Sequence, residues 1–200
     1  MTFLCYKLCD LPADSAAQAL LDASELAAYA QRGDTFLKTR STLKRELARR
    51  LDTPASELHL SMTEHGKPIL PGSPLHFNLS HSAEHLCIAF HCSPVGVDIQ
   101  LSRPKAATER LAARIMCPQQ LQAWRARGAT AAEFFDCWCT AEALVKQAAA
   151  TIWQAQQFPF LWYPGRIQPL FAGAPHVRLF TPTDGYHGAV AYHPSPSEQA

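Results

Sequence analysis

Apolar and polar positions change their spacing several times along the chain, and each change predicts an element. Loose alternation over residues 2–9 predicts a strand, and the Ala- and Leu-rich stretch that follows predicts a helix from Asp14 or Ser15 to about Tyr29. A second helix is expected from Asp34 until Pro54 ends the pattern. Its apolar side chains are spaced to bury one side of the helix: Phe36, Leu37, Leu43, Leu47 and Leu51.

The rest of the chain predicts short strands, then helices, then strands again. Residues 58–82 hold Gly and Pro turn signals between strand-like pieces, and the apolar runs 86–90 and 95–99 predict a hairpin. Two helices are expected over 105–127 and 130–149, with Pro118 starting or breaking one of them. Short strands follow at 158–180 and 186–193, and the tail from Pro194 is expected to fray.

Both halves of the chain therefore combine helix and strand, which predicts an α+β fold. The pattern changes just after Asp98, so we expect an N-terminal half over 1–100 and a C-terminal half over 101–200. With 48% apolar residues, a chain of 200 residues can bury a substantial core.

Charge limits the classes of partner. The formal net charge is +1, so no global field attracts nucleic acid or a membrane, and an anionic ligand needs a local basic patch. The helix expected from Asp34 supplies one, because only Asp34 and Glu46 oppose its cations. Those cations are Lys38, Arg40, Lys44, Arg45, Arg49 and Arg50.

The cysteines and the hydropathy pattern indicate a cytoplasmic protein. Seven cysteines form no Cys-x-x-Cys pair, so we expect reduced, mostly buried thiols and no disulfide framework or zinc site. The first residues lack the basic and apolar regions of a signal peptide. No apolar stretch approaches the length of a membrane span.

The first candidate for chemistry is the strand Val95–Gln100. Side chains alternate along a strand, so Asp98 and Gln100 share one face and the apolar residues share the other. An acid within a strong β run costs desolvation energy unless a cation or donor meets it. The plain alternative is that this face is exposed at a sheet edge.

Two further segments carry candidates. Trp138, Glu142 and Lys146 lie on one stripe of a helix, where the alternative is a surface ion pair beside a core tryptophan. Phe77-Asn-Leu-Ser80-His81-Ser82 is expected in a loop between strands, where its polar side chains can bind phosphate oxygens or cap the backbone. Alone, a histidine in such a segment is more often structural, and Gly66-Lys67-Pro68 is an ordinary turn with an exposed lysine.

The order of these segments along the chain favours the functional interpretation of each segment over the structural one. Gly-Lys-Pro, Phe-Asn-Leu-Ser-His-Ser, Gly-Val-Asp-Ile and Trp-x-x-x-Glu-Ala-x-x-Lys follow one another here. The ordered set resembles the 4'-phosphopantetheinyl transferase superfamily, specifically its Sfp-like branch. The basic stretch 36–45 and the segment 185–193 are similar to that family's early helix and closing strand, so the resemblance covers residues 34–193.

The resemblance implies a fold and a reaction. The fold would be two similar α/β halves related by a pseudo-two-fold, with the active site between them. The enzyme would move the 4'-phosphopantetheine arm of coenzyme A onto a serine of an apo acyl or peptidyl carrier protein, releasing adenosine 3',5'-bisphosphate. Asp98 and Glu142 would hold Mg²⁺, which also binds the pyrophosphate. Lys146 would contact the phosphates at the reacting centre, and Glu142 would help to deprotonate the serine.

The resemblance also assigns coenzyme A contacts. His81 would contact the 3'-phosphate with Ser80 beside it, and Lys67 and Arg40 would line the anion site. A monomer is expected because one chain already carries both halves.

Two residues depart from the family pattern. Gln100 stands where the family commonly has Glu, and Ala141 where it has Lys. A neutral amide can still offer an oxygen to the metal, so Gln100 is included with Asp98 and Glu142 as a metal ligand, with lower affinity expected. Two alternatives stay open: a weakened paralogue that binds coenzyme A or carrier protein, and a Mg²⁺-dependent phosphohydrolase.

Overall fold

The structure is a computed structural model that describes residues 1–103, 108–195 and 198. Its helices are α1 (Ser15–Gln18), α2 (Ala23–Arg32), α3 (Asp34–Leu51), α4 (Thr108–Ile115), α5 (Pro118–Ala126) and α6 (Ala131–Gln147). Short 3-10 helices lie at η1 (Leu8–Asp10), η2 (Ala55–Glu57) and η3 (Ile152–Gln157).

Two antiparallel three-stranded sheets form the centre of the molecule. The first has the order β1-β5-β4, built from β1 (Thr2–Lys7), β5 (His85–His91) and β4 (His76–Ser82). The second has the order β6-β10-β9, built from β6 (Val95–Leu101), β10 (Tyr186–Tyr192) and β9 (His176–Phe180). Two small ribbons pair β2 (Ser61–Met62) with β3 (Pro68–Ile69), and β7 (Phe160–Tyr163) with β8 (Arg166–Pro169).

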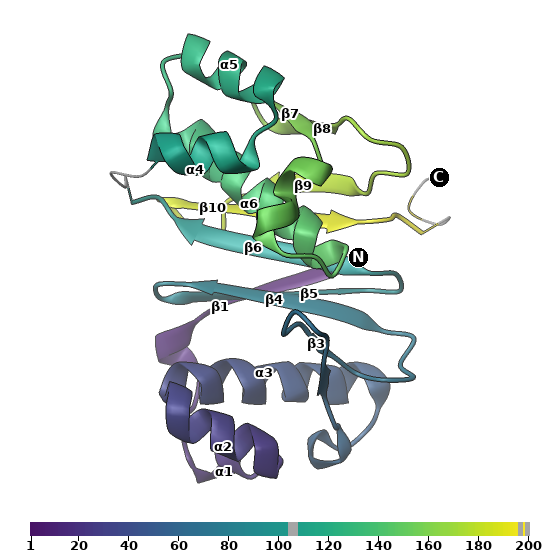
Figure 1. Cartoon of the computed structure of the whole chain (residues 1–200). Coiled ribbons are helices and arrows are strands. Elements are labelled where there is room, and N and C mark those ends of the chain that lie inside the picture. Colours follow the sequence, from purple (N-terminus) through teal and green to yellow (C-terminus); the bar gives the residue numbers. More distant parts are fainter. Residues whose placement is uncertain (104–107, 196–197, 199–200) are drawn as a thin grey trace.

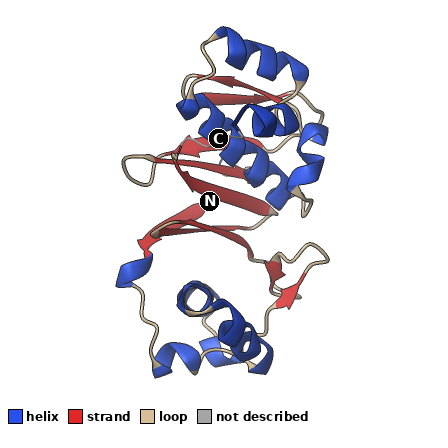
Figure 2. Ribbon diagram, turned by 60° about the vertical axis from the view of Figure 1, so that its left-hand side comes forward, coloured by secondary structure: helices blue, strands red, loops and turns tan. Residues whose placement is uncertain are grey.

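The elements stack in layers, as Figures 1 and 2 show. The helices α1–α3 lie on one side of the two sheets and α4–α6 on the other, so the sheets meet in the middle (Figure 1). Buried residues between the sheets include Ala89 of β5, Val97 and Ile99 of β6, and Val190 of β10. Separate apolar cores lie under α3 and under α6, which gives each sheet one helical cover.

The predicted hairpin of residues 86–90 and 95–99 is wrong. Both runs are strands, but β5 pairs with β1 and β4, whereas β6 pairs with β10. The turn between them leads from one sheet to the other, so sheet membership changes before Val95. The division at residue 100 and the pseudo-two-fold relation of the halves stay predictions.

Capping residues explain the helix boundaries. The helix predicted to reach Tyr29 is two helices, because Asp22 caps α2 in a capping box with Glu25. Asp14 caps α1 as expected, and α3 begins at Asp34 as expected. The region 108–147 holds three helices where two were predicted, and Pro118 starts the middle one. The predicted helix start at residue 105 lies outside the described residues.

The cysteine prediction needs a correction. Cys5 and Cys87 form a disulfide, since they lie directly opposite each other in the β1–β5 pair, with their Cα atoms 4.3 Å apart. Spacing along the chain could not reveal this, because the two residues meet only through strand pairing. The free cysteines are Cys9 and Cys92, which are exposed, Cys117, which is half-buried, and Cys137 and Cys139, which are buried.

None of the helices within the described residues combines the length and apolar character that crossing a membrane requires.

Candidate active site

Helix α6 covers the polar face of β6 at close range. A Cβ atom on Gly96 would lie 2.0 Å from the carbonyl oxygen of Ala143 and 2.5 Å from the backbone nitrogen of Gln147, so only glycine permits this contact. The face that carries Asp98 is therefore buried under a helix. The alternative of an exposed sheet edge is excluded.

Asp98 lies at the centre of a cluster of polar side chains. Its Oδ1 atom accepts hydrogen bonds from Ser80 Oγ and from Lys146 Nζ, both at 2.6 Å, while its side chain is only 2% exposed. Gln100 Nε2 lies 3.3 Å from Oδ2 of the same carboxylate. The cation and donors that a buried acid needs are thus present.

Glu142 completes the cluster from the same helix as Lys146. Its Oε2 atom lies 3.9 Å from Lys146 Nζ, so one ammonium joins two carboxylates. Burial raises the pKa of Glu142, and Asp98 adds to the rise against the opposing effect of Lys146. Burial acts to lower the pKa of Lys146, but Asp98 and Glu142 outweigh it and the pKa is raised. The single ammonium of Lys146 therefore offsets only part of the negative charge of the two carboxylates.

The donor set fits a hard cation. Mg²⁺ is usually held by one or two carboxylates together with water and substrate phosphates, and Asp98 and Glu142 supply two carboxylates at one place. The amide of Gln100 is also within reach of this cluster. Three or more acidic, histidine or cysteine side chains do not gather as a metal site in the part of the chain that the structure describes. A cation here would need oxygen atoms from a substrate as well.

Strand β4 holds β6 through side chains. Asn78 Oδ1, Ser80 Oγ and Ser82 Oγ accept hydrogen bonds from alternate backbone N–H groups of β6. The donors are Val97 at 2.8 Å, Ile99 at 3.3 Å and Leu101 at 3.0 Å. We call these six residues the β4–β6 seam. Sequence analysis assigned Ser80 to coenzyme A and left the other two with phosphate binding or backbone capping as alternatives. They bind the backbone of β6, and the segment is a strand and not the loop that was expected.

Arg40 and His81 line one pocket of about 340 Å³, which also contains Phe36, Thr39 and Met62. Arg40 lies over the Phe36 ring, 5.3 Å from its centroid, and 3.2 Å from the Glu25 carboxylate. Burial lowers the pKa of His81, and Lys146 lowers it further against the effect of Asp98. The pKa of His81 thus depends on the charges of the Asp98 cluster, although its side chain lines the pocket beside the basic helix α3.

Glu25 is a residue that sequence analysis missed. It contacts Arg40 at 3.2 Å and Lys44 at 2.7 Å, so it fixes two cations of α3 from the neighbouring helix. Lys44 also donates to the Leu20 carbonyl, which turns it away from the pocket. The Asp-x-x-Glu pattern that begins α2 could have drawn attention to Glu25.

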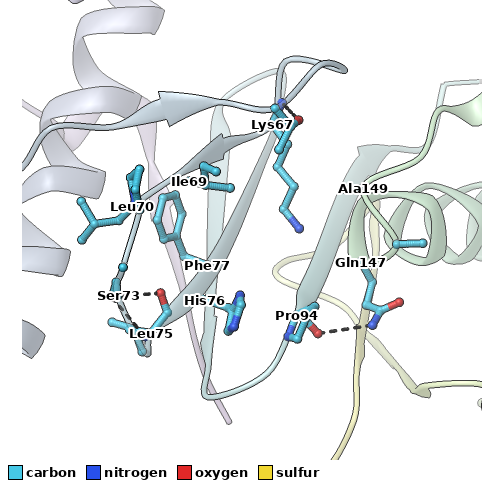
Figure 3. Close-up of a pocket in the computed structure, with 14 residues that line it drawn as sticks. Lys67, Ile69, Leu70, Ser73, Leu75, His76, Phe77, Pro94, Gln147 and Ala149 are labelled. Atoms are coloured by element: carbon cyan, nitrogen blue, oxygen red, sulfur yellow. Dashed lines mark hydrogen bonds between the residues drawn. The ribbon is translucent and has the colours of Figure 1, made fainter.

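Lys67 does not line the Arg40–His81 pocket. It lies between two other pockets and lines both of them. Its ammonium donates to the carbonyl oxygens of Val95 at 3.0 Å and Lys146 at 2.6 Å. Burial lowers the pKa of Lys67 to about 8, with a further contribution from Lys146. Figure 3 shows Lys67 reaching across a mostly apolar cavity of about 560 Å³ toward β6 and the end of α6. On its other side lies a smaller pocket of about 180 Å³, which Lys146 also lines.

The structure thus forms one cluster from five predicted residues: Ser80, Asp98, Gln100, Glu142 and Lys146. It places Arg40 and His81 in a second group at a neighbouring pocket, which shares three lining residues with the pocket of Lys146. Arg40 and His81 therefore line a pocket next to the one that Lys146 lines, and Lys146 contacts the two carboxylates of the cluster.

Comparison with known proteins gives consistent matches. The sequence model of a family described as the 4'-phosphopantetheinyl transferase superfamily matches residues 94–194. The 4'-phosphopantetheinyl transferase Sfp of Bacillus subtilis is 37% identical over 59 residues, which cover 29% of this chain and 26% of that protein. A putative 4'-phosphopantetheinyl transferase of Synechocystis is 33% identical over 149 residues, covering 68% of this chain and 60% of the relative.

The matched length is limited in each relative. The 4'-phosphopantetheinyl transferase AcpT of Salmonella typhi is 35% identical over 96 residues, which cover 46% of this chain and 50% of that protein. The chain thus spans between about a quarter and three fifths of these curated relatives. The family model covers half of the chain, including β6, α6 and β10. On this match, the chain belongs to the 4'-phosphopantetheinyl transferase superfamily.

Proposed function

We propose that this protein transfers the 4'-phosphopantetheine arm of coenzyme A to a serine of an apo acyl or peptidyl carrier protein. The main support is the buried Asp98–Lys146–Glu142 cluster beside a pocket that contains Arg40 and His81. Coenzyme A carries a pyrophosphate and a 3'-phosphate, so it needs two separate places of positive charge. A metal ion held by Asp98 and Glu142 would supply one of these places, and Arg40 with His81 would line the other.

Asp98 and Glu142 would hold Mg²⁺, with the Gln100 amide as a weaker, neutral partner. When bound, the ion supplies charge that stabilises the pyrophosphate as negative charge builds on it. Ser80 holds the Asp98 carboxylate in place through its 2.6 Å hydrogen bond. Lys146 lies against the same carboxylate, from where its ammonium would also contact the substrate phosphates.

Glu142 is the group that best suits proton transfer. Its carboxylate lies beside Lys146 in the cluster and its side chain is 20% exposed, so a serine hydroxyl of the carrier can approach it. In the proposed reaction the serine O–H bond breaks and the serine oxygen bonds to the β-phosphorus. The bond from that phosphorus to the bridging pyrophosphate oxygen breaks, and adenosine 3',5'-bisphosphate leaves with that oxygen. The serine proton goes to Glu142.

His81 and Arg40 would bind the 3'-phosphate. Arginine offers several N–H donors to phosphate oxygens, and Glu25 holds it in position. Lys67 faces the carbonyl groups of β6 and α6, so we propose that it shapes the pyrophosphate side of the site and contacts the anion only if it leaves those carbonyls.

We also propose that one chain is sufficient for the reaction, because both groups of site residues belong to it. A monomer working in the cytoplasm is the simplest arrangement. Light scattering at assay concentration would measure the oligomeric state.

The decisive experiment is mass spectrometry of apo carrier proteins incubated with coenzyme A, Mg²⁺ and the purified protein. Acyl and peptidyl carrier proteins should each be tried, with an Asp98→Asn variant as the control for the site. Transfer adds the phosphopantetheine mass to the carrier serine and releases adenosine 3',5'-bisphosphate. Hydrolysis releases the nucleotide without changing the carrier. Binding of coenzyme A without either product would identify a non-catalytic family member.

A further inference from the structure

The Cys5–Cys87 disulfide lies in line with the side chain that holds Asp98. Cys87 is the direct partner of Cys5 on one side and of Ser80 on the other, in the order β1-β5-β4. Residues directly opposite each other in a sheet project to the same face. Ser80 then donates to Asp98 at 2.6 Å. A row of neighbouring side chains, Cys5, Cys87 and Ser80, therefore connects the disulfide with the Asp98 carboxylate.

We propose that the Cys5–Cys87 disulfide is a redox-sensitive modification site that is coupled to the position of Ser80 and Asp98. Its breakage would loosen the Ser80–Asp98 contact, and its formation would tighten it. The consequence for activity rests on the proposed transferase function, whereas the coupling itself does not.

A reductant can reach one sulfur of this bond. Cys5 is exposed and lies on β1, an edge strand, while Cys87 is fully buried. The reaction needs a dithiol reductant. Its thiolate attacks the Cys5 sulfur to form a mixed disulfide, and Cys87 leaves as a thiolate that takes up a proton. The second thiol of the reductant then displaces Cys5, so the protein gains two thiols while the dithiol is oxidised to its disulfide.

Packing gives the coupling its physical basis. Once the bond breaks, the two sulfur atoms must separate from bonding distance to van der Waals contact. Cys87 has no free space, since it is packed in the layer between the two sheets with Val97 and Ile99 of β6. Part of the separation can be taken up by the exposed Cys5, and any displacement of Cys87 falls on its neighbours on the same face, of which Ser80 is the direct one.

The test is a redox titration of the whole protein with defined ratios of reduced to oxidised dithiothreitol. The fraction of reduced Cys5 and Cys87 is read by alkylation and peptide mass spectrometry, which separates them from the free cysteines. Coupling between sites is reciprocal, so loss of the Ser80 hydroxyl must change the disulfide equilibrium. In Ser80→Ala, half-reduction should need about fivefold less reductant than in the wild type.

Controls separate coupling from general loosening. Ser80→Thr keeps the hydroxyl and should restore the wild-type titration. Ser82→Ala removes a hydroxyl from the same strand and seam but is not opposite Cys87, so its shift should be less than about twofold. If Ser80→Ala does not fold, Asp98→Asn takes its place in the same titration. Equal curves for wild type and Ser80→Ala, or equal shifts for Ser80→Ala and Ser82→Ala, would overturn the proposal.

Activity gives a second readout. Carrier modification by the oxidised protein should be about fivefold faster than by the reduced protein, and Cys5→Ala should stay at the reduced level under both conditions. A redox shift in Ser80→Ala without any transferase activity would refute the proposed function and leave the coupling standing. Transferase activity with superimposed titrations would refute the coupling and leave the function standing.

Discussion

At the scale of single residues, Lys146 shows how context changes the meaning of a motif. The Glu142–Lys146 pair has the spacing of an ordinary surface ion pair, which contributes a few tenths of a kcal/mol. Here the ammonium lies 2.6 Å from Asp98, a carboxylate that is 2% exposed. Removing one partner of a buried pair leaves a charge without compensation, so this lysine matters for both the fold and the site.

His81 provides a test of the anion site. The change His81→Ala should weaken coenzyme A binding about tenfold or more, because a hydrogen bond to a charged phosphate is lost. Binding of dephospho-coenzyme A, which lacks the 3'-phosphate, should change little. Isothermal titration calorimetry with both ligands measures the difference. His76→Ala, on the exposed start of the same strand, is the matched control. Equal losses for the two ligands would count against the proposed contact.

Gln100 provides a test of the metal site. In Gln100→Glu a second carboxylate faces Asp98 Oδ2, so the variant without metal should be less stable by about 1 kcal/mol. Mg²⁺ should then raise its melting temperature more than that of the wild type, and half-maximal transfer should need less Mg²⁺. Gln168→Glu, an exposed position on β8, controls for added charge. An unchanged metal titration would remove Gln100 from the site.

Sequence analysis identified the residues of the Asp98 cluster because their types and order carry the signal. It could not assign their partners. The coenzyme A contacts of Ser80 and Lys67 stay predictions, and the structure adds partners that were not foreseen: Ser80 holds Asp98, and Lys67 donates to two carbonyl groups. Such contacts depend on how β4 and α6 pack on β6, which no local pattern specifies.

At the scale of elements, the packing of α6 on β6 positions the chemistry. Gly96 lies under Ala143 and Gln147, and Asp98 follows two residues later on the same face of the strand. The distance between helix and strand therefore decides whether Lys146 reaches Asp98. The types of the elements were predictable from periodicity. The β6–β10 pairing was not, because the two strands are far apart in the sequence and no local pattern specifies which strands pair.

The change Gly96→Ala should destabilise the protein by about 3 kcal/mol or more, because the new methyl group clashes with the backbone of α6. Urea denaturation measures the loss. The double change with Ala143→Gly should not restore stability, since the clash is with the carbonyl oxygen at position 143 and not with its side chain. Recovery in the double variant would show that α6 lies elsewhere.

At the scale of the whole molecule, Lys67 connects the side of the molecule that holds β3 with the side that holds β6 and α6. It extends from the loop before β3 and binds the carbonyl groups of β6 and of the end of α6. A cation near a helix C-terminus is favourable, but burial of this ammonium opposes its charge. The connection can persist without the charge, because a neutral amine still has two N–H groups for the two carbonyl oxygens.

The pH dependence of stability tests this connection. The pKa of Lys67 falls from 10.5 to about 8 on folding, so between these values the unfolded chain binds more protons than the folded one. The free energy of unfolding should therefore rise with pH over this window by about 2–3 kcal/mol relative to a Lys67→Met variant. Denaturation at several pH values measures it, with Lys7→Met as the control for losing one exposed lysine. A flat difference would show that Lys67 is not buried as described.

The β4–β6 seam has a consequence for solubility. β6 is an edge strand of its sheet, and an edge with unpaired N–H groups can recruit a strand from another chain and start aggregation. In this protein the outward N–H groups of Val97, Ile99 and Leu101 already bind side-chain oxygens of β4. The edge that carries Asp98 is thus closed to foreign strands by three side chains of β4, one of which is the hydroxyl that holds Asp98 in place.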